Sequence, residues 1–388
     1  MEYRVYSDIK DISLLDGSTD AKSAVYDLWR ECFGDSTSYT DFYFNWKMKD
    51  NQVYTVFKGE RIASMLHLNP YILSVGGKKI TSNYIVGVAT KEEDRRQGLM
   101  KLLLEKAMNQ MNEEEMPFTY LMPAKEAIYL PFGFRIVYEQ ESFKQQIINT
   151  REEISLRGIN AIMHEAIDTI ILDSDNDMNL ERIVDFTDQY LESVYDIFVS
   201  RDKYYYKRLI HEMHSSQGEV MLVLQNGMII GYIAYVKEND LQVAEAIYLP
   251  HKKEEFWYGV TDRLSGFLSE EQILHNPPTI MARIINLNSF IAGITAIKET
   301  SLIIDVVDDI IWSNNGAFEV TFTQTGSKCT PTEKAPEIKG NISEFTKLFF
   351  GQDKEKLALS MLDQDNDIIL EKLNNINYYS NVFINDVV

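Results

Sequence analysis

The sequence predicts an α+β protein built on mixed sheets. Two short β-runs, residues 53–57 and 61–68, are separated by Lys-Gly-Glu, as in an antiparallel hairpin. A strand at 79–88 then precedes a helix whose apolar residues recur with helical spacing: Met100, Leu103, Leu104, Ala107, Met108 and Met111. A further strand is expected at 117–122. Hairpins followed by a strand–helix–strand crossover combine antiparallel and parallel pairing in one sheet.

Length, composition and charge limit the kinds of protein that this chain can be and the partners that it can bind. The chain has 388 residues, which favours two or three domains, and its 45% hydrophobic content is ample for buried cores. No apolar run reaches the ~18 residues of a membrane span, and the N-terminus lacks the apolar core of a signal peptide. The formal charge of −21 argues against nucleic acid or anionic membrane as a partner. Cys32 and Cys329 are expected to be free thiols, which favours the cytoplasm.

The other elements of the first region, residues 1–150, are expected in the following order. Residues 21–33 have the apolar spacing of a helix, and 42–46 form a second short helix with aromatic side chains. These aromatics either wall a substrate cleft or, more commonly, pack in the core. Residues 124–130 form a short helix or turn, and 136–147 a last strand. His67 lies in an alternating strand, where a packed histidine is more common than a ligand.

The second region, residues 151–283, repeats part of the first. Residues 220–235 match 53–68 in pattern, with a strand, a glycine turn and a strand, and Asn226-Gly227 is a strong hairpin signal. A helical stretch at 254–268 follows, but no Arg-x-x-Gly sequence precedes it. We therefore expect a degenerate second copy that shapes the site without binding a coenzyme. No metal site is predicted, because His211-Glu-Met-His214 does not have the spacing of the His-Glu-x-x-His motif.

The third region, residues 284–388, contains two paired strands, 301–307 and 317–323. Ser343 is the expected cap of a helix at 344–350, which Gly351 ends, and 354–362 form another helix. The tail from residue 378 to 388 is apolar and aromatic to its last residue. Because free tails are usually polar and loose, this pattern indicates a tail docked inside the molecule.

The turn between strand 79–88 and the following helix has the features of an anion cradle. Its sequence is Arg95-Arg96-Gln97-Gly98-Leu99-Met100. The first N–H groups of a helix lack internal partners and carry partial positive charge, and Gly98 lets a ligand approach the backbone closely. This combination suits a pyrophosphate. Basic surface turns with glycine are common, however, so the motif alone does not decide between a ligand site and an ordinary turn.

This stretch resembles the coenzyme A loop of the GNAT acetyltransferases, whose pattern is Arg/Gln-x-x-Gly-x-Gly/Ala. Here Arg95 and Gly98 match, and Met100 replaces the small last residue. Residues 127–134, Ala-Ile-Tyr-Leu-Pro-Phe-Gly-Phe, resemble a segment of the Eis (enhanced intracellular survival) acetyltransferases, and 302–322 resemble their sterol-carrier-like third domain. The resemblance implies a catalytic GNAT domain at 1–150, a degenerate GNAT-like domain at 151–283 and a sterol-carrier-protein-like domain at 284–388.

The resemblance also implies roles for individual residues. Tyr129 aligns with the tyrosine that protonates the departing thiolate, and the C-terminal carboxylate of Val388 with the general base. In the Eis pattern Lys125 stands where an acidic residue is expected. Coenzyme A is expected to contact the following residues: Val88, Ala89, Thr90, Arg95, Arg96, Gln97, Gly98, Leu99, Met100, Lys101, Ala124 and Lys125.

The implied activity is transfer of an acetyl group from acetyl-CoA to a primary amine, without a metal. The acceptor is a small-molecule amine, for which aminoglycosides, polyamines and lysine side chains are the classes that the resemblance suggests. Two alternatives stay open: an acyl or aminoacyl transferase of the tandem-GNAT type, and a non-enzymatic acyl-CoA or lipid-binding protein. The resemblance implies a homo-oligomer, with a hexamer as one form.

Overall fold

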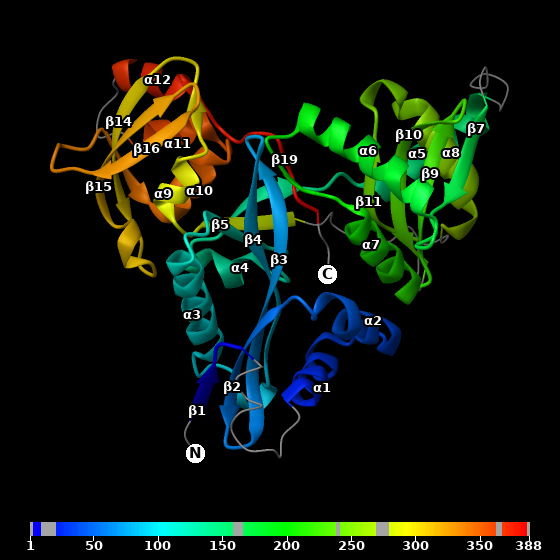
Figure 1. The fold of residues 1–388 in the computed structure, drawn as a ribbon, viewed down its shortest axis with the longest axis horizontal. Coiled ribbons are helices and arrows are strands. Elements are labelled where there is room, and N and C mark those ends of the chain that lie inside the picture. The colour runs from blue at the N-terminus through cyan, green and yellow to red at the C-terminus, as the bar shows by residue number, and fades with distance from the viewer. Residues whose placement is uncertain are drawn as a thin grey trace.

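The computed structural model describes residues 3–8, 21–157, 166–237, 241–268, 279–361 and 367–385. Figure 1 shows three units: the first, blue to cyan, lies below the second, green, and the third, yellow to red. Within these described ranges, no helix is both long enough and apolar enough to cross a bilayer.

The first unit is a large mixed sheet. Its main path runs through β1 (Tyr3–Tyr6), β2 (Gln52–Lys58), β3 (Arg61–Val75), β4 (Lys78–Thr90), β5 (Phe118–Leu121), β12 (Thr279–Ile284) and β6 (Arg135–Glu139). Neighbouring pairs are antiparallel except β4 and β5, which are parallel. Two short strands extend it, β8 (Ile197–Val199) on β3 and β19 (Val382–Phe383) on β8.

Helices cover both faces of this sheet. On one face lie α1 (Ala21–Phe33), α2 (Thr37–Phe42) and the π-helical turn η2 (Tyr43–Lys47), whose aromatic side chains pack in a buried cluster. On the other lies α3 (Leu99–Glu113). Its buried residues are Leu99, Leu103, Leu104, Ala107, Met108 and Met111. This set confirms the helical face expected from the sequence, except that Leu99 takes the place of Met100, which is only partly buried.

The second unit repeats the strand–helix–helix–three-strand–helix order. Its sheet has the order β11 (Gln242–Tyr248), β10 (Met228–Val236), β9 (Glu219–Gln225) and β7 (Ile167–Ile171). One face packs on α6 (Asp177–Val194) and α7 (Lys203–Ser215), the other on α5 (Phe143–Arg157) and α8 (Lys253–Leu264). The expected hairpin at 220–235 is confirmed, with Asn226 (φ 50) and Gly227 (φ 77) in its turn.

The third unit has a four-stranded sheet in the order β16 (Gly326–Pro331), β15 (Gly316–Thr323), β14 (Thr300–Val307) and β17 (Ile338–Asn341). The short pair β13 (Thr295–Ala296) and β18 (Ile376–Asn377) lies beside it. Its helices are α9 (Leu287–Ile291), α10 (Ile342–Phe349), α11 (Lys354–Ser360) and α12 (Asp367–Asn374). One buried cluster joins this unit to the upper half of the first sheet.

Two elements cross the boundaries expected at 150/151 and 283/284. Helix α5 begins at Phe143 and packs on the second unit through Phe143 and Ile147. Strand β12 follows the second unit in sequence but inserts between β5 and β6 of the first. The first sheet is therefore completed by a strand from beyond the whole second unit.

Two local expectations are wrong. The strand expected at 136–147 ends at Glu139, because Glu139-Gln140-Glu141 interrupts the apolar run and Phe143, Ile147 and Ile148 have helical spacing in α5. The cap of α10 is Asn341 rather than Ser343. Its side chain accepts from the Glu344 amide (3.1 Å), while Glu344 accepts from the Asn341 amide (2.8 Å), forming a capping box.

Candidate active site

A loop between β4 and α3 presents unpaired backbone donors. The chain makes one 3₁₀ turn, η3 (Glu92–Asp94), and then passes through Arg96 (φ 62) and Gly98 (φ 78) before the helix begins. Within the described part of the chain, the amide N–H groups of Arg96, Gln97 and Gly98 donate to no other group. All three residues are exposed. Three free donors at a helix N-terminus, next to two arginines, can hold a pyrophosphate.

A buried carboxylate anchors this loop. Asp94 is fully buried and forms ion pairs with Lys58 (3.0 Å) and Arg61 (2.5 Å). Burial tends to raise the pKa of the Asp94 carboxyl, but the hydrogen bonds from Lys58 and Arg61 outweigh it and hold the pKa below its usual value. Tyr3 also donates to Asp94 (3.2 Å). The start of the cradle is thus tied to β1, β2 and β3.

The end of β4 offers a free backbone edge. Its bridge to β5 is confined to Tyr84 and Tyr120, so the two parallel strands diverge beyond this point. On the other side, Ala89 and Thr90 stay paired with Met65 and Ser64 of β3. Residues 88–90 therefore keep one edge for a ligand, as the resemblance to the GNAT fold implies for the amides of the coenzyme.

A bulge at Gly87 redirects this strand end. Gly87 and Val88 together oppose Leu66 of β3, and Gly87 has φ 61. A Cβ atom at Gly87 would lie 2.6 Å from Cζ3 of Trp29, so position 87 requires glycine for both its conformation and its contact.

Tyr129 lies at the end of α4 (Glu126–Tyr129), soon after β5. Its side chain is 8% exposed and its ring packs edge-on against Phe134, with 6.0 Å between centroids. Burial raises the pKa of the Tyr129 phenol to about 12. Among the described residues its hydroxyl has no hydrogen-bond partner, so it stays available as a proton donor.

The structure brings four of the predicted site residues into one packed region. Tyr129 and Leu99 belong to one buried cluster, against which Val88 and Met100 also pack. Tyr129 thus shares this region with the end of β4 and the start of α3. Two further predicted contacts, Ala124 and Lys125, lie exposed at the start of α4, between β5 and Tyr129.

His67 is a buried neutral histidine. The Tyr43 hydroxyl lies 3.0 Å from its Nδ1, and Asn51 donates to that same hydroxyl (2.8 Å). Because Tyr43 accepts from Asn51, its own proton is directed to His67 Nδ1. Burial lowers the pKa of His67 to about 3. A base this weak is poorly matched to deprotonating an amine near neutral pH.

The tail returns to the centre of the molecule, which confirms the docking expected from its apolar sequence. Strand β19 pairs in parallel with β8, Ile384 is fully buried and Asn385 is 4% exposed. Arg201 donates to the Asn385 side chain (3.3 Å). The predicted base, Val388, lies outside the described residues.

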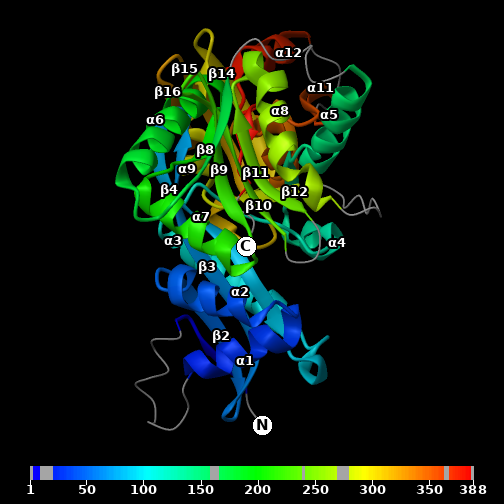
Figure 2. The same cartoon turned by 90° about the vertical axis from the view of Figure 1, so that its right-hand side faces the viewer.

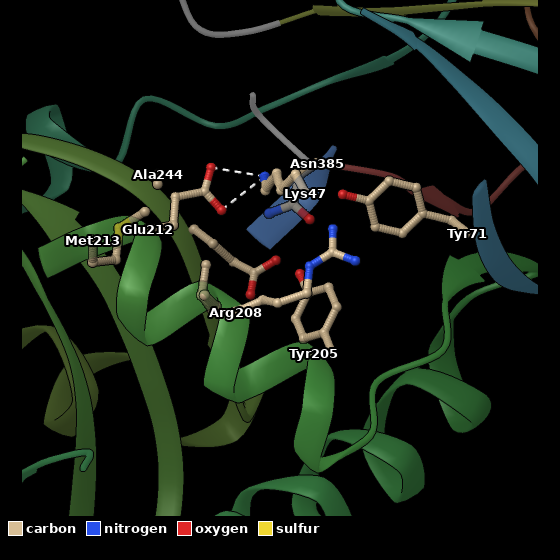
Figure 3. A pocket seen from close by; sticks show the side chains of 10 residues that line it. Lys47, Tyr71, Tyr205, Arg208, Glu212, Met213, Ala244 and Asn385 are labelled. Carbon is tan, nitrogen blue, oxygen red and sulfur yellow. Dashed lines mark hydrogen bonds and ion pairs between the residues drawn. The ribbon is translucent and has the colours of Figure 1, made fainter. Parts of the chain in front are cut away.

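A small cavity lies where the tail meets the first and second units (Figure 3). Asn385 lines it together with Lys47 of η2, Tyr71 of β3, and Arg208 and Glu212 of α7. The cavity encloses about 30 Å³, room for about two water molecules. Lys47 and Glu212, which both line it, form a nearly buried ion pair (2.8 Å), and Glu245, which also lines it, pairs with Arg201 (2.5 Å).

These cavity residues were not identified from the sequence. Lys47 and Glu212 are 165 positions apart, and no motif spacing links them. The apolar tail was the available signal, since it indicated that a C-terminal segment is buried somewhere in the molecule. The charged residues that line this cavity balance one another, because Lys47 and Arg208 stand against Glu212 and Glu245.

Two family models match separate parts of the chain. Residues 17–137 match the family model described as acetyltransferase (GNAT) domain, and residues 287–359 match the sterol carrier protein domain. A search of curated proteins found no match.

Solved structures share the whole fold. A probable N-acyltransferase from Enterococcus faecalis V583 has a TM-score of 0.77 at 16% identity, with 100% of both chains covered. A GCN5-related N-acetyltransferase from Anabaena variabilis has a TM-score of 0.72 at 16% identity, with the same coverage. Eis1 from Mycobacterium abscessus has a TM-score of 0.67 at 11% identity, again over 100% of each chain. At these identities the likeness concerns the fold. The chain therefore contains a GNAT acetyltransferase domain, followed by a second GNAT-like unit and a sterol carrier protein domain.

Proposed function

We propose that the protein transfers an acetyl group from acetyl-CoA to a primary amine. The observation that carries the proposal is the placement of Tyr129: its unpartnered hydroxyl belongs to the same packed region as the coenzyme loop. The free amides of residues 96–98 would bind the pyrophosphate, and the free edge of residues 88–90 the pantetheine arm.

The proposed reaction is a direct displacement. The amine nitrogen attacks the thioester carbonyl carbon and forms a tetrahedral intermediate, whose oxyanion the backbone N–H groups near Val88 stabilise. The carbon–sulfur bond then breaks, and the Tyr129 phenol gives its proton to the departing thiolate. The amine gives a proton to the general base, and the products are an amide and coenzyme A.

The proposed base is the C-terminal carboxylate of Val388. Support comes from Asn385, which is buried at the meeting of the first and second units three positions before the chain end. A carboxylate near a buried cavity would have its pKa raised by desolvation, toward the range of a useful base. The acceptor amine would then reach the thioester from the side of the tail.

We also propose that the protein is a homo-oligomer. This proposal rests on the resemblance alone.

The carrier alternative is disfavoured by the packing of the third unit. Its buried phenylalanines contact one another, with 6.0 Å between the rings of Phe345 and Phe349 and 5.4 Å between those of Phe290 and Phe350. Side chains in close contact leave little room for a lipid chain among the described residues. We therefore assign to this unit the role of delivering the tail.

The test is an assay of free thiol released from acetyl-CoA, with polyamines and aminoglycosides as acceptors. Three chains are compared with the native one: Tyr129→Phe, a chain extended by a few residues past Val388, and Tyr204→Phe as a control at an exposed tyrosine (45% exposed). We expect turnover by the native chain and the control, and large losses in the other two. Full activity of the extended chain would rule out the terminal carboxylate as base, and binding of acetyl-CoA without turnover on any amine would contradict the proposed function.

A further inference from the structure

A second, larger cavity lies between the first and second units, on another side of the tail. It occupies about 400 Å³ next to strand β6 of the first sheet and strand β11 of the second, both of them edge strands. Aromatic side chains dominate its wall: Tyr138, Tyr190, Tyr195, Tyr248 and Phe383. We call it the aromatic cavity. It shares none of its lining residues with the cavity at Asn385.

The rings of the wall meet at different angles: Tyr195 and Phe383 are tilted by 33° at 5.0 Å between centroids, whereas two other pairs are steep. Tyr190 and Tyr195 are nearly perpendicular (83°, 6.4 Å between centroids), and Tyr138 meets Phe383 at 76° (5.8 Å). All four tyrosines are only partly buried, whereas Phe383 is buried. Phe256 stacks on Tyr248 (20°, 4.9 Å) and Phe186 lies parallel to Tyr190 (8°, 6.3 Å), so each of these two tyrosines keeps at most one ring face for a ligand.

Negative charge accompanies these rings. The Glu139 and Glu141 carboxylates also line the cavity, and the Tyr248 hydroxyl lies 3.5 Å from Glu141. Burial raises the pKa of the phenols of Tyr195 and Tyr248, and the charge of Glu141 raises both further. The charge of Glu141 also raises the pKa of Tyr138 in β6, so it acts on rings from both units. Lys253, on the second unit, also lines the cavity.

The chemistry of this wall selects one class of ligand. The face of an aromatic ring is electron-rich and attracts a cation within about 6 Å of its centre, most strongly where water is excluded. A carboxylate beside such rings adds a counter-charge. A volume of about 400 Å³ is within the range of small-molecule sites. We propose that the aromatic cavity binds an organic ammonium ion, with its alkyl groups against the tyrosine rings and its charge facing Glu141.

An ammonium ion bound in the aromatic cavity would stabilise the docked tail. Phe383 belongs to β19, and Asn385 is two residues further along. The Phe383 ring already carries the Arg201 guanidinium (5.3 Å to its centre), so the alkyl groups of the ligand, and not its charge, would contact this ring and favour the docked position of the last described strand. This inference does not depend on the proposed acetyl transfer, because the cavity and its charge stand apart from Tyr129 and the coenzyme loop.

The test measures binding of choline and of its uncharged isostere, 3,3-dimethylbutan-1-ol, to the full chain by titration calorimetry. We expect choline to bind at least tenfold more tightly. Tyr190→Leu and Glu141→Gln should each weaken choline binding about tenfold or more. Tyr190→Phe, which keeps the ring, should bind within twofold of the native chain, as should Glu152→Gln at an exposed glutamate of α5.

Several outcomes would overturn the proposal. Equal affinity for choline and the isostere would show an apolar site without cation selectivity, and no binding of choline would show no site for this class. Unchanged binding in both Tyr190→Leu and Glu141→Gln would place any observed site elsewhere. Comparing Tyr190→Phe with Tyr190→Leu keeps the test valid if the leucine variant is unstable. None of these results depends on acetyl transfer, so failure of either proposal is seen separately.

Discussion

Arg283 donates from Nη2 to Oδ1 of Asp308 over 2.6 Å, and the side chains of both residues are almost completely buried. The pair joins β12 of the first sheet to the turn after β14 of the third unit. Asp308 also accepts from the amides of Ile310 and Ile311 and from the Asn314 side chain. One carboxylate therefore orders a turn and fixes the third unit against the first.

We expect Arg283→Met to lower the free energy of unfolding by about 3–5 kcal/mol, because it leaves the Asp308 carboxylate buried without its counter-charge. Urea unfolding monitored by circular dichroism measures the change. The matched control is Lys298→Met, which breaks the exposed Lys298–Glu371 pair and should change the free energy of unfolding far less, because solvent screens this pair. Equal effects of the two substitutions would contradict the special role of the buried pair.

Tyr129→Phe should lower kcat for acetyl transfer by about 10²–10⁴-fold, because the thiolate then leaves without a proton donor. The KM for acetyl-CoA should change little, since the ring is kept. With its pKa raised to about 12, the phenol of the native chain stays protonated to high pH, so loss of the Tyr129 proton should not limit the rate near pH 10. Steady-state rates from pH 6 to 10 measure both points. A variant with native kcat would assign the proton to another group.

His67 should make stability depend on pH in the acidic range. Its pKa is about 3 in the folded chain and about 6.5 when unfolded, so protons bind the unfolded state more readily. The contribution of neutral His67 to the free energy of unfolding is complete above pH 6.5. It is lost as the pH falls from there toward 3, at up to about 1.4 kcal/mol per pH unit. Urea midpoints between pH 7 and 4.5 should fall more steeply for the native chain than for His67→Gln. Parallel slopes would contradict the prediction.

Gly98→Ala should weaken the coenzyme site with a modest cost in stability. Position 98 has φ 78 and no atom within 4 Å of an added Cβ, so alanine fits sterically but is strained by about 1–2 kcal/mol. The methyl group would extend into the space proposed for the pyrophosphate. We therefore expect the KM for acetyl-CoA to rise about tenfold. The kcat should change less, since a lost binding contact affects KM first.

Gly77→Ala is the control for this prediction. Gly77 has φ 77 and equally open surroundings, but it lies in the turn between β3 and β4. Its substitution should cost similar stability and leave the KM unchanged. An equal rise of KM in both variants would indicate a general effect of strain.

Local patterns predicted much of the fold. The apolar spacing of α3 and the Asn226-Gly227 turn are encoded within a few residues, and the structure confirms both. The cap of α10 was also readable, because Asn341 and Glu344 have capping-box spacing, although the sequence interpretation chose Ser343. Errors of this kind concern which of two polar residues, here two positions apart, begins a helix.

Long-range pairing was not predictable. Strand β12 is an ordinary apolar run, and its insertion between β5 and β6 depends on a fit to strands far away in sequence. The same holds for the candidate site: the loop proposed to bind the coenzyme lies within one short stretch and could be proposed from the sequence, whereas Lys47, Glu212 and Asn385 come from three separate segments. A single sequence contains no periodicity that links such positions.

Strand β12 is synthesised late, which has a consequence for folding of the chain on the ribosome. Strands β5 and β6 emerge early, but the strand that separates them is made only after the entire second unit has followed. Until then the nascent first unit has two unpaired strand edges, which are templates for aggregation. Truncated chains that end before residue 279 should therefore need chaperones, and the chain as a whole should fold slowly for its size.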